Sequence, residues 1–363
     1  MQCVNCDPIW RLLSRGLFCV VPMLKPTPKL IDVARRAEVS TATVSRVLNR
    51  PDSVRAELRA RVLRVIEEIG FVPNAGARAL SLNRSGNIGL LIPTVDNAIF
   101  ANGIQAFQKH LSAHGFQMLL ATSEYDIDKE MQQAMNLVSR GVEALAIFGR
   151  SQRPESLQFL VQRRLPYVHV GVDHAPLEAY CIGFDNQAAM DKVVHYLVDL
   201  RHARIAMIAG ITDHNDRARD RVKGVRRALK ACGLSLPAHY LVEQPYQLER
   251  ARQAMRQLLA LPKPPTAVVC GNDILALGAL IECQRLGFKV PGQISIIGFD
   301  DLEISRHFSP SLTTVRVPTD LMWERAADYL VRRLRGETIA KSLNIDVSLI
   351  VRESTGPARK LAP

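Results

Sequence analysis

The sequence predicts a small all-α head followed by a larger α/β body of two lobes. Three observations support this fold class. Residues 30–69 carry their apolar side chains at helical spacing. From Asn87 onward, short apolar runs alternate with amphipathic segments, the pattern of parallel sheets covered by helices. The length of 363 residues is enough for two or three domains with sizeable cores.

The composition is that of a globular protein. Hydrophobic residues make up 47% and charged residues 23%, which excludes a wholly disordered chain. No apolar run approaches the ~18–20 residues of a membrane-spanning helix. Residues 1–24 lack the long apolar stretch of a secretory signal, and they are interpreted as a disordered tail or an over-extended gene start, with Met23 the true start. The seven cysteines show no framework spacing, which predicts buried thiols in a reducing, cytoplasmic compartment.

The positive charge is concentrated near the N-terminus. The formal net charge is +12, and residues 25–90 carry 12 Lys and Arg against 6 Asp and Glu, a net +6. Half of the excess therefore lies in less than a fifth of the chain. A basic module favours a polyanionic partner, and nucleic acid before membrane because no basic amphipathic membrane helix accompanies it.

Within the head, residues 30–49 are typical of a helix-turn-helix. Their apolar positions lie at helical spacing on both sides of a break at residues 38–40, and Ser40 is a suitable N-cap for the second helix. The outward face of that helix carries short side chains and one long cation, which suits entry into a DNA major groove. These residues are Thr41, Ala42, Ser45 and Arg46. The alternative is an ordinary surface helical hairpin.

A third helix is predicted after this motif. Ser53 is its expected cap, an apolar stripe runs through residues 58–69, and Gly70 ends it. The opposite face is basic and suits phosphate contacts. It carries Arg55, Arg59, Arg61 and Arg64. This third helix favours the DNA-binding interpretation over the simple hairpin.

Two segments carry a specific resemblance to a known family. DVARRAEVSTATVSRVLN and FVPNAGARALSLNRSGNIGLLIP resemble the DNA-binding head and hinge of the lac/gal repressor family, and the match continues from about Lys29 to Thr355. The resemblance implies an all-α helix-turn-helix head joined by a hinge helix to a two-lobed α/β body like that of periplasmic binding proteins. We expect Thr41, Ala42 and Arg46 to read bases. Phosphate contacts are expected from Thr43, Ser45 and Arg50.

The resemblance also implies a hinge helix over Asn74–Leu82 that orders on operator DNA. Leu80 stands where paired hinge helices of a dimer push a leucine into the minor groove. The expected hinge contacts are Asn74, Ala77, Arg78 and Leu80. Two residues depart from the family pattern. Gly76 costs ~1 kcal/mol of helix propensity relative to Ala, and Glu38 stands at a left-handed turn position where the family commonly has Gly or Asn, at a cost of ~1 kcal/mol.

The body is predicted from seven strands and five helices. The candidate strands are IGLLI (88–92), QMLLA (117–121), ALAIF (144–148), YVHV (167–170), IAMIA (205–209), AVVC (267–270) and ISIIG (294–298). The candidate helices are Phe100–Ala113, Lys129–Arg140, Asn186–Leu200, Arg217–Cys232 and Leu248–Leu261. The strand count predicts two parallel sheets with a break near Asp185–Asn186. Ligands bind at the carboxyl ends of such strands, so two facing lobes predict a cleft.

Polar and aromatic residues at the strand ends are candidates for an effector site. Asp273 follows AVVC and is equally suited to capping the next helix. The resemblance implies that Arg221 grips hydroxyls or a carboxylate, that Asp300 lies in the cleft and that Tyr246 lies against a ligand ring. The expected effector-binding residues are Asn97, Phe100, Arg221, Tyr246, Asn272 and Asp300. An aromatic platform with Asn, Asp and Arg suits a sugar or sugar acid, although Val317 occupies a position that is often polar in sugar-binding members.

No catalytic signature is present in the sequence. It contains no GxSxG, no GxGxxG after a strand, no Walker loop and no HExxH. His110 and His114 are four residues apart but lack a third ligand, so solvated histidines are favoured over a metal site. We therefore expect no enzyme, no cofactor and no metal.

The expected function is a sequence-specific DNA-binding transcription regulator, most often a repressor in the resembled family, controlled by a small effector. Two alternatives stay open. A solute-binding protein of transport would need an export signal and no basic head. A nucleotide-sugar enzyme would need a base or nucleophile at a strand end.

The expected partners are operator double-stranded DNA, a small effector and a second copy of the chain. A two-fold operator requires two heads at a fixed spacing, which predicts a homodimer or a dimer of dimers. The expected contact surfaces are the helix after Ile99 and the helix near Leu275–Leu286. The expected domains are the tail (1–24), the head (25–73), the hinge and linker (74–85) and the body (86–363), with lobes at about 86–186 plus 318–345 and about 187–317 plus 346–357.

Overall fold

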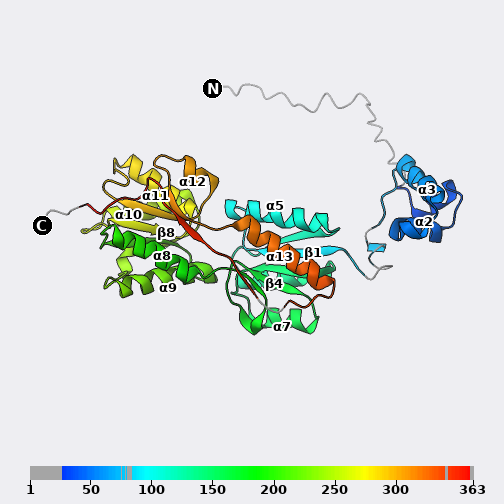
Figure 1. The fold of residues 1–363 in the computed structure, drawn as a ribbon, viewed down its shortest axis with the longest axis horizontal. Coiled ribbons are helices and arrows are strands. Elements are labelled where there is room, and N and C mark those ends of the chain that lie inside the picture. The colour runs from blue at the N-terminus through cyan, green and yellow to red at the C-terminus, as the bar shows by residue number, and fades with distance from the viewer. Residues whose placement is uncertain (1–26, 75, 78, 80–83, 340–341, 360–363) are drawn as a thin grey trace, which may run out of the picture. The chain divides into compact units, whose positions relative to one another are not determined.

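The computed structural model describes residues 27–74, 76–77, 79, 84–339 and 342–359 (Figure 1). They form two compact units, one ending at Asn83 and the other beginning at Arg84. The predicted fold class, a helix-turn-helix head with a two-lobed α/β body, is confirmed. The N-terminal tail and the hinge residues Arg78 and Leu80 lie outside the described residues.

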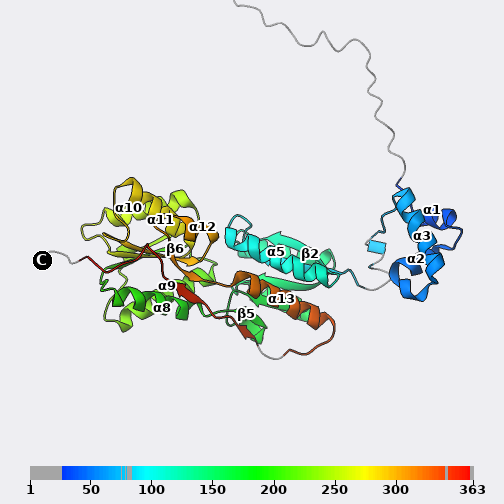
Figure 2. The same ribbon diagram turned by 45° about the horizontal axis from the view of Figure 1, so that its top comes forward.

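The head is a three-helix unit (Figure 2). Its helices are α1 (Leu30–Arg36), α2 (Thr41–Asn49) and α3 (Ala56–Ile69), with a short 3-10 turn, η2 (Pro51–Ser53), before α3. Each helix contributes a fully buried valine to a shared core, namely Val33, Val44 and Val62. The apolar spacing of the sequence therefore defines one closed core that three short helices share.

The turn between α1 and α2 has the predicted conformation. The Ser40 Oγ accepts the Thr43 backbone N–H at 3.1 Å, the usual N-cap geometry. Glu38 has φ 56°, so a non-glycine residue does occupy the left-handed position. The prediction that Ser53 caps the third helix is wrong. Ser53 ends η2 and donates its hydroxyl hydrogen to the Arg50 carbonyl at 2.7 Å, and α3 begins at Ala56.

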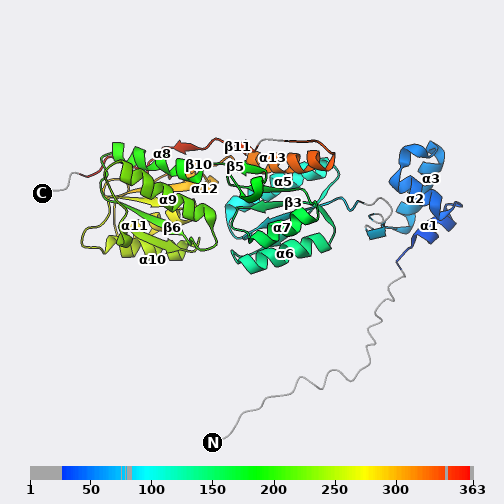
Figure 3. The same cartoon turned by 90° about the horizontal axis from the view of Figure 1, so that it is seen from below.

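The first lobe of the body is a parallel sheet with helices on both faces (Figure 3). Its strand order is β11-β5-β4-β3-β1-β2. The strands are β1 (Asn87–Ile92), β2 (Gln117–Thr122), β3 (Val142–Phe148), β4 (Tyr167–Val170), β5 (Cys181–Gly183) and β11 (Leu343–Asn344). Helices α5 (Ala98–Ala113) and α13 (Thr319–Leu334) cover one face. Helices α6 (Ile127–Ser139) and α7 (Pro154–Gln162) cover the other.

The second lobe repeats this plan with the order β12-β10-β9-β8-β6-β7. All neighbours are parallel except β12, which pairs antiparallel with β10. The strands are β6 (Ile205–Gly210), β7 (Leu241–Gln244), β8 (Ala267–Cys270), β9 (Ser295–Asp300), β10 (Thr313–Arg316) and β12 (Ser348–Ile350). Helices α8 (Asn186–Asp199) and α9 (Asp216–Ala231) pack on one face, and α10 (Leu248–Leu259) and α11 (Asp273–Arg285) on the other. The short α12 (Glu303–His307) follows β9.

Among the residues that the structure describes, the thiols are mostly internal. Cys181, Cys270 and Cys283 are buried and free, whereas Cys232 at the end of α9 is half-buried. Over the residues that the structure describes, no helix combines the length and the hydropathy needed to cross a bilayer. The same residues hold no cluster of three or more His, Cys, Asp or Glu side chains arranged as metal ligands.

Candidate functional site

The exposed face of α2 presents the side chains proposed to read bases. Thr41, Ala42 and Arg46 are exposed, whereas Thr43 and Ser45 are half-buried. The Thr43 and Ser45 hydroxyls already have partners inside the head, because Thr43 Oγ1 lies 2.9 Å from Ser40 Oγ and Ser45 Oγ accepts from Asn49 at 3.3 Å. The free face of the helix is therefore narrow, with Arg46 as its single long cation.

The third helix adds an exposed basic surface beside this face. Arg55, Arg61 and Arg64 are exposed, and Arg59 makes a 3.7 Å ion pair with Asp52. These guanidinium groups can hold phosphates without reading sequence. Arg50 is exposed at the C-terminal end of α2.

The start of the hinge has a helix cap. The Asn74 Oδ1 accepts the backbone N–H groups of Gly76 at 2.8 Å and Ala77 at 3.2 Å. This is the pattern by which Asn initiates a helical turn. Asn74 and Ala77 thus lie at the first turn of the expected hinge helix.

In the body, one pocket between the lobes gathers all six predicted effector residues. It is lined by Asn97, Ile99, Phe100, Tyr125, Phe148, Asn215, Arg217, Arg221, Tyr246, Asn272 and Asp300. Each of them is the last residue of a strand, lies just beyond the carboxyl end of a strand, or lies in the first turns of the helix that follows. Parallel strands bring these ends to one edge of each sheet, and the two edges face each other.

Together with Arg217, Arg221 is one of two buried cations in the lining of this pocket. Its Nε donates to Asn186 Oδ1 at 2.9 Å, its Nη1 donates to the Gly271 carbonyl at 2.6 Å, and its guanidinium lies 3.7 Å from the centre of the Phe299 ring. Burial lowers the pKa of this group from its usual value. No carboxylate among the described residues is hydrogen-bonded to it, so its charge is held by neutral acceptors and a ring face.

Two neighbouring side chains have polar atoms without a hydrogen-bond partner among the described residues. These atoms are Asn272 Nδ2 and Asp300 Oδ1, both buried. Asn272 caps α11, because its Oδ1 accepts the Leu275 N–H at 2.9 Å, and its amide hydrogens remain without an acceptor among the described residues. Burial raises the pKa of Asp300 to about 8, although Arg221 opposes that rise. Buried polar groups without hydrogen-bond partners are rare in proteins. A pocket that contains an unpartnered amide and an unpartnered carboxyl oxygen suits a hydroxylated ligand, which can bond to both.

The capping role considered for Asp273 is not found. Asn272 is the N-cap of α11, and Asp273 is fully buried behind the pocket. Its carboxylate accepts from the Leu302 N–H at 2.8 Å and the Ser305 hydroxyl at 2.6 Å. Burial raises its pKa to about 6. Asp273 therefore supports the segment that directly follows Asp300, the last residue of β9.

The first lobe provides the aromatic wall of the pocket. The Phe100 and Phe148 rings meet edge to face at 4.9 Å, and Tyr125 faces Tyr246 of the other lobe at 6.4 Å. Phe148, the last residue of β3, and Tyr125, in the loop after β2, were not predicted from the sequence, because no motif marks either residue. Arg217 and Asn215, at the start of α9, were also missed. Val317 is packed in the core and does not line the pocket.

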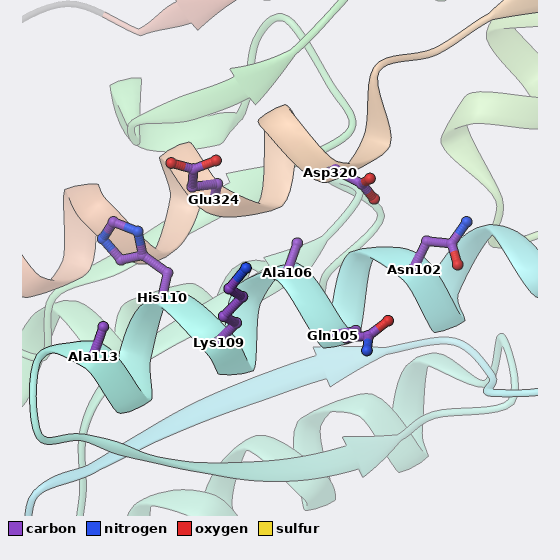
Figure 4. A pocket seen from close by; sticks show the side chains of 8 residues that line it. All are labelled: Asn102, Gln105, Ala106, Lys109, His110, Ala113, Asp320 and Glu324. Carbon is purple, nitrogen blue, oxygen red and sulfur yellow. The ribbon is translucent and has the colours of Figure 1, made fainter.

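A second hollow lies on the outer surface of the first lobe, between α5 and α13. This groove measures about 680 Å³ and is lined by Asn102, Gln105, Ala106, Lys109, His110, Ala113, Asp320 and Glu324 (Figure 4). It belongs to the helix after Ile99, one of the two expected dimer surfaces. The other expected surface, the helix near Leu275–Leu286, stays a prediction. Residues 275–280 of α11 are buried inside the second lobe, which leaves only the end of the helix exposed.

A DNA-binding head on a two-lobed body with a polar pocket between its lobes defines an effector-controlled transcriptional regulator. Residues 29–74 match the family model of bacterial regulatory proteins of the lacI family, and residues 194–355 match that of periplasmic binding protein-like domains. The chain belongs to the lacI family of bacterial regulatory proteins.

Relatives and solved structures agree with this assignment. The HTH-type transcriptional repressor CytR of Escherichia coli K12 is 33% identical over 326 residues, which is 89% of this chain and 95% of CytR. The HTH-type transcriptional repressor PurR of Klebsiella pneumoniae is 32% identical over 327 residues, again 89% of this chain and 95% of PurR.

Among solved structures, a lac repressor dimer bound to operator and the anti-inducer ONPF has a TM-score of 0.81 and 26% identity, covering 91% of this chain and 99% of that one. A transcriptional regulator CelR–cellobiose complex has a TM-score of 0.66 and 30% identity, covering 90% and 99%.

Proposed function

We propose that this chain is a cytoplasmic homodimeric repressor, with a dimer of dimers as the alternative assembly. It binds operator DNA through α2 and the hinge, and it acts by binding and not by catalysis. The repressor names of CytR and PurR and the dimeric, operator-bound lac repressor support this proposal. The domain boundaries stated for the sequence are proposed with it.

On the DNA side, Thr41, Ala42 and Arg46 contact bases, and Thr43, Ser45 and Arg50 contact phosphates. The hinge residues Asn74, Ala77, Arg78 and Leu80 complete the proposed interface. The exposed narrow face of α2 supports the first group. Two heads held at fixed spacing would read the two halves of a palindromic site.

On the effector side, we propose a sugar or sugar acid, held by Asn97, Phe100, Arg221, Tyr246, Asn272 and Asp300. One observation carries this assignment. The unpartnered amide of Asn272 and the unpartnered oxygen of Asp300 lie in the same pocket as Arg221. Hydroxyl groups donate and accept at once, so they can satisfy both atoms. The cellobiose in the CelR complex shows that a related regulator takes a carbohydrate.

Two experiments test the proposal. In a gel-shift assay with genomic fragments from around its own gene, the protein should retain at least one fragment at low salt, and failure with every fragment would remove the repressor assignment. Sugars, aldonic acids and nucleobases should be screened by thermal shift on the wild type and on Arg221→Ala. A ligand that stabilises both proteins equally would show that Arg221 is not an anchor.

A further inference from the structure

A charged contact bridges the two lobes beside the effector pocket. The loop after β3 supplies Arg150 and Ser151 from the first lobe, and the start of α9 supplies Asp216 and Asp220 from the second. Ser151 Oγ lies 3.2 Å from Asp216 Oδ1 and accepts the Asp216 N–H at 3.1 Å. The Arg150 N–H donates to Asp216 Oδ2 at 3.2 Å, and its guanidinium pairs with Asp220. We call these four residues the interlobe clasp.

The two carboxylates of the clasp are buried and Arg150 and Ser151 are half-buried, which distinguishes the clasp from a surface ion pair. The side chains of Arg150, Asp216 and Asp220 are 15%, 3% and 7% exposed. Burial alone would raise the pKa of Asp216, but Arg217 and Arg150 hold it below the usual value. Exposed ion pairs contribute little to stability, whereas a buried one that loses a partner leaves an uncompensated charge.

The first-lobe half of the clasp is held rigidly. His169 on β4 donates its Nδ1–H to the Gly149 carbonyl at 2.7 Å, which anchors the loop to the sheet. Gly149 has φ +89°, and a Cβ there would lie 1.7 Å from Arg217 Nη1. The glycine therefore leaves room for the Arg217 side chain, whose Nη1 donates a hydrogen bond to Asp216 at 2.8 Å. The Arg217 guanidinium reaches the first lobe, where it lies 4.4 Å from the centre of the Phe148 ring.

With these contacts formed, the pocket is nearly filled by protein. The space left between its side chains is about 30 Å³, whereas pockets that hold small ligands usually measure about 300–1,000 Å³. A sugar-sized molecule needs more space than this, and a movement that parts the lobes at this loop separates Arg150 and Ser151 from Asp216 and Asp220.

We propose that the interlobe clasp holds the effector cleft shut and that an effector gains access only when the clasp opens. The proposal rests on the proposed function for the assignment of the cleft to an effector. Opening exposes all four groups to water together, so no charge is left buried and alone, and the step is reversible. The clasp thus sets the fraction of molecules able to accept a ligand.

The test is amide hydrogen exchange on the full-length protein without DNA or small molecules. In Arg150→Met, segments 149–152 and 215–220 should exchange at least tenfold faster than in the wild type, together with the Tyr246 loop across the cleft. The matched control is Arg153→Met. Arg153 lies three residues away and pairs at 2.6 Å with Asp128 of its own lobe, so its removal should leave these segments unchanged.

Exchange in β6 and β8 reports whether the second lobe is intact. If Arg150→Met also loses protection in β6 and β8, the second lobe is not intact, and Ser151→Ala becomes the test variant. In Ser151→Ala, segments 149–152 and 215–220 should exchange at least threefold faster than in the wild type. The proposal would be overturned if a variant kept β6 and β8 protected while segments 149–152 and 215–220 exchanged at the wild-type rate. Because no ligand is used, this outcome is separate from the Arg221→Ala thermal-shift result.

Discussion

At the scale of single residues, Arg46 and Arg50 are exposed cations four positions apart with different surroundings. Arg46 lies on the helical face that carries Thr41 and Ala42, whereas Arg50 is the C-cap residue at the end of the helix, with φ −144° and ψ 63°. Arg46→Ala should therefore cost about 1–3 kcal/mol of operator binding and relax preference at one base pair. Arg50→Ala should weaken specific and random DNA alike. Competition binding with single-base operator variants checks both. Equal weakening of specific and random DNA by Arg46→Ala would contradict the base-reading role.

The pKa of Asp300 gives a second prediction at this scale. Its folded-state pKa is raised to about 8, while an unfolded Asp titrates near 3.9. Between these values the folded chain binds the extra proton, so stability falls as pH rises from about 4 to 8. Asp300→Asn cannot ionise and avoids this loss. The melting temperature of Asp300→Asn minus that of the wild type should be higher at pH 9 than at pH 5. In free energy of unfolding, this change should be at least about 1.4 kcal/mol, the equivalent of one pKa unit.

The neighbouring Asp301 is the control for this measurement. Burial would raise its pKa, but Arg316 and Arg352 hold it below the usual value. Its stabilising contribution is complete above the unfolded pKa and is lost only as pH falls below it. Asp301→Asn should therefore lower stability by the same amount at pH 5 and pH 9. A pH-independent difference for Asp300→Asn as well would show that Asp300 does not titrate in this range.

At the scale of elements, the strongly apolar strands were predictable and the short or polar ones were not. Six of the seven predicted strands bury mainly apolar side chains between two helical layers, whereas β2, at the edge of its sheet, is half-buried or exposed along its whole length. Strands β5 and β11 have three and two residues, too few for a pattern. The sequence TTVR of β10 is polar because its threonines bond to buried partners such as Asp273. Six pocket residues followed from the family resemblance, whereas Arg217 and Phe148 depend on a contact across the lobes that periodicity cannot reveal.

The turn of the head carries a prediction at the same scale. Glu38 has φ 56°, where side chains with a Cβ are strained by about 1 kcal/mol. Its side chain is exposed and has no packing role. Glu38→Gly should therefore stabilise the head by about 0.5–1 kcal/mol, seen as slower hydrogen exchange in α1 and α2. Glu57→Gly, at the first turn of α3, should do the opposite. Faster exchange in Glu38→Gly would contradict the strain argument.

At the scale of the whole molecule, the groove between α5 and α13 offers a surface for a second copy. Ala106 lies in its lining with Lys109 and Glu324 (Figure 4). Ala106→Arg would fill the groove with a cation and should convert a dimer into a monomer. Sedimentation at micromolar concentration without DNA checks this, and operator affinity should fall at least tenfold. The control Gln132→Arg, on the exposed side of α6, should change neither the sedimentation nor the operator affinity. A wild-type protein that sediments as a monomer would count against the dimer itself.

The last strand of each sheet, β11 in the first lobe and β12 in the second, determines when the body can fold during synthesis. The first sheet needs β11 at Leu343–Asn344 and the second needs β12 at Ser348–Ile350. Ser354 then closes the second sheet by accepting the Ile296 N–H at 2.9 Å. The head, by contrast, is complete at Gly70. On the ribosome the DNA-binding part can therefore fold before either lobe has been synthesised, whereas neither lobe of the sensor can finish until residues 343–354 have emerged.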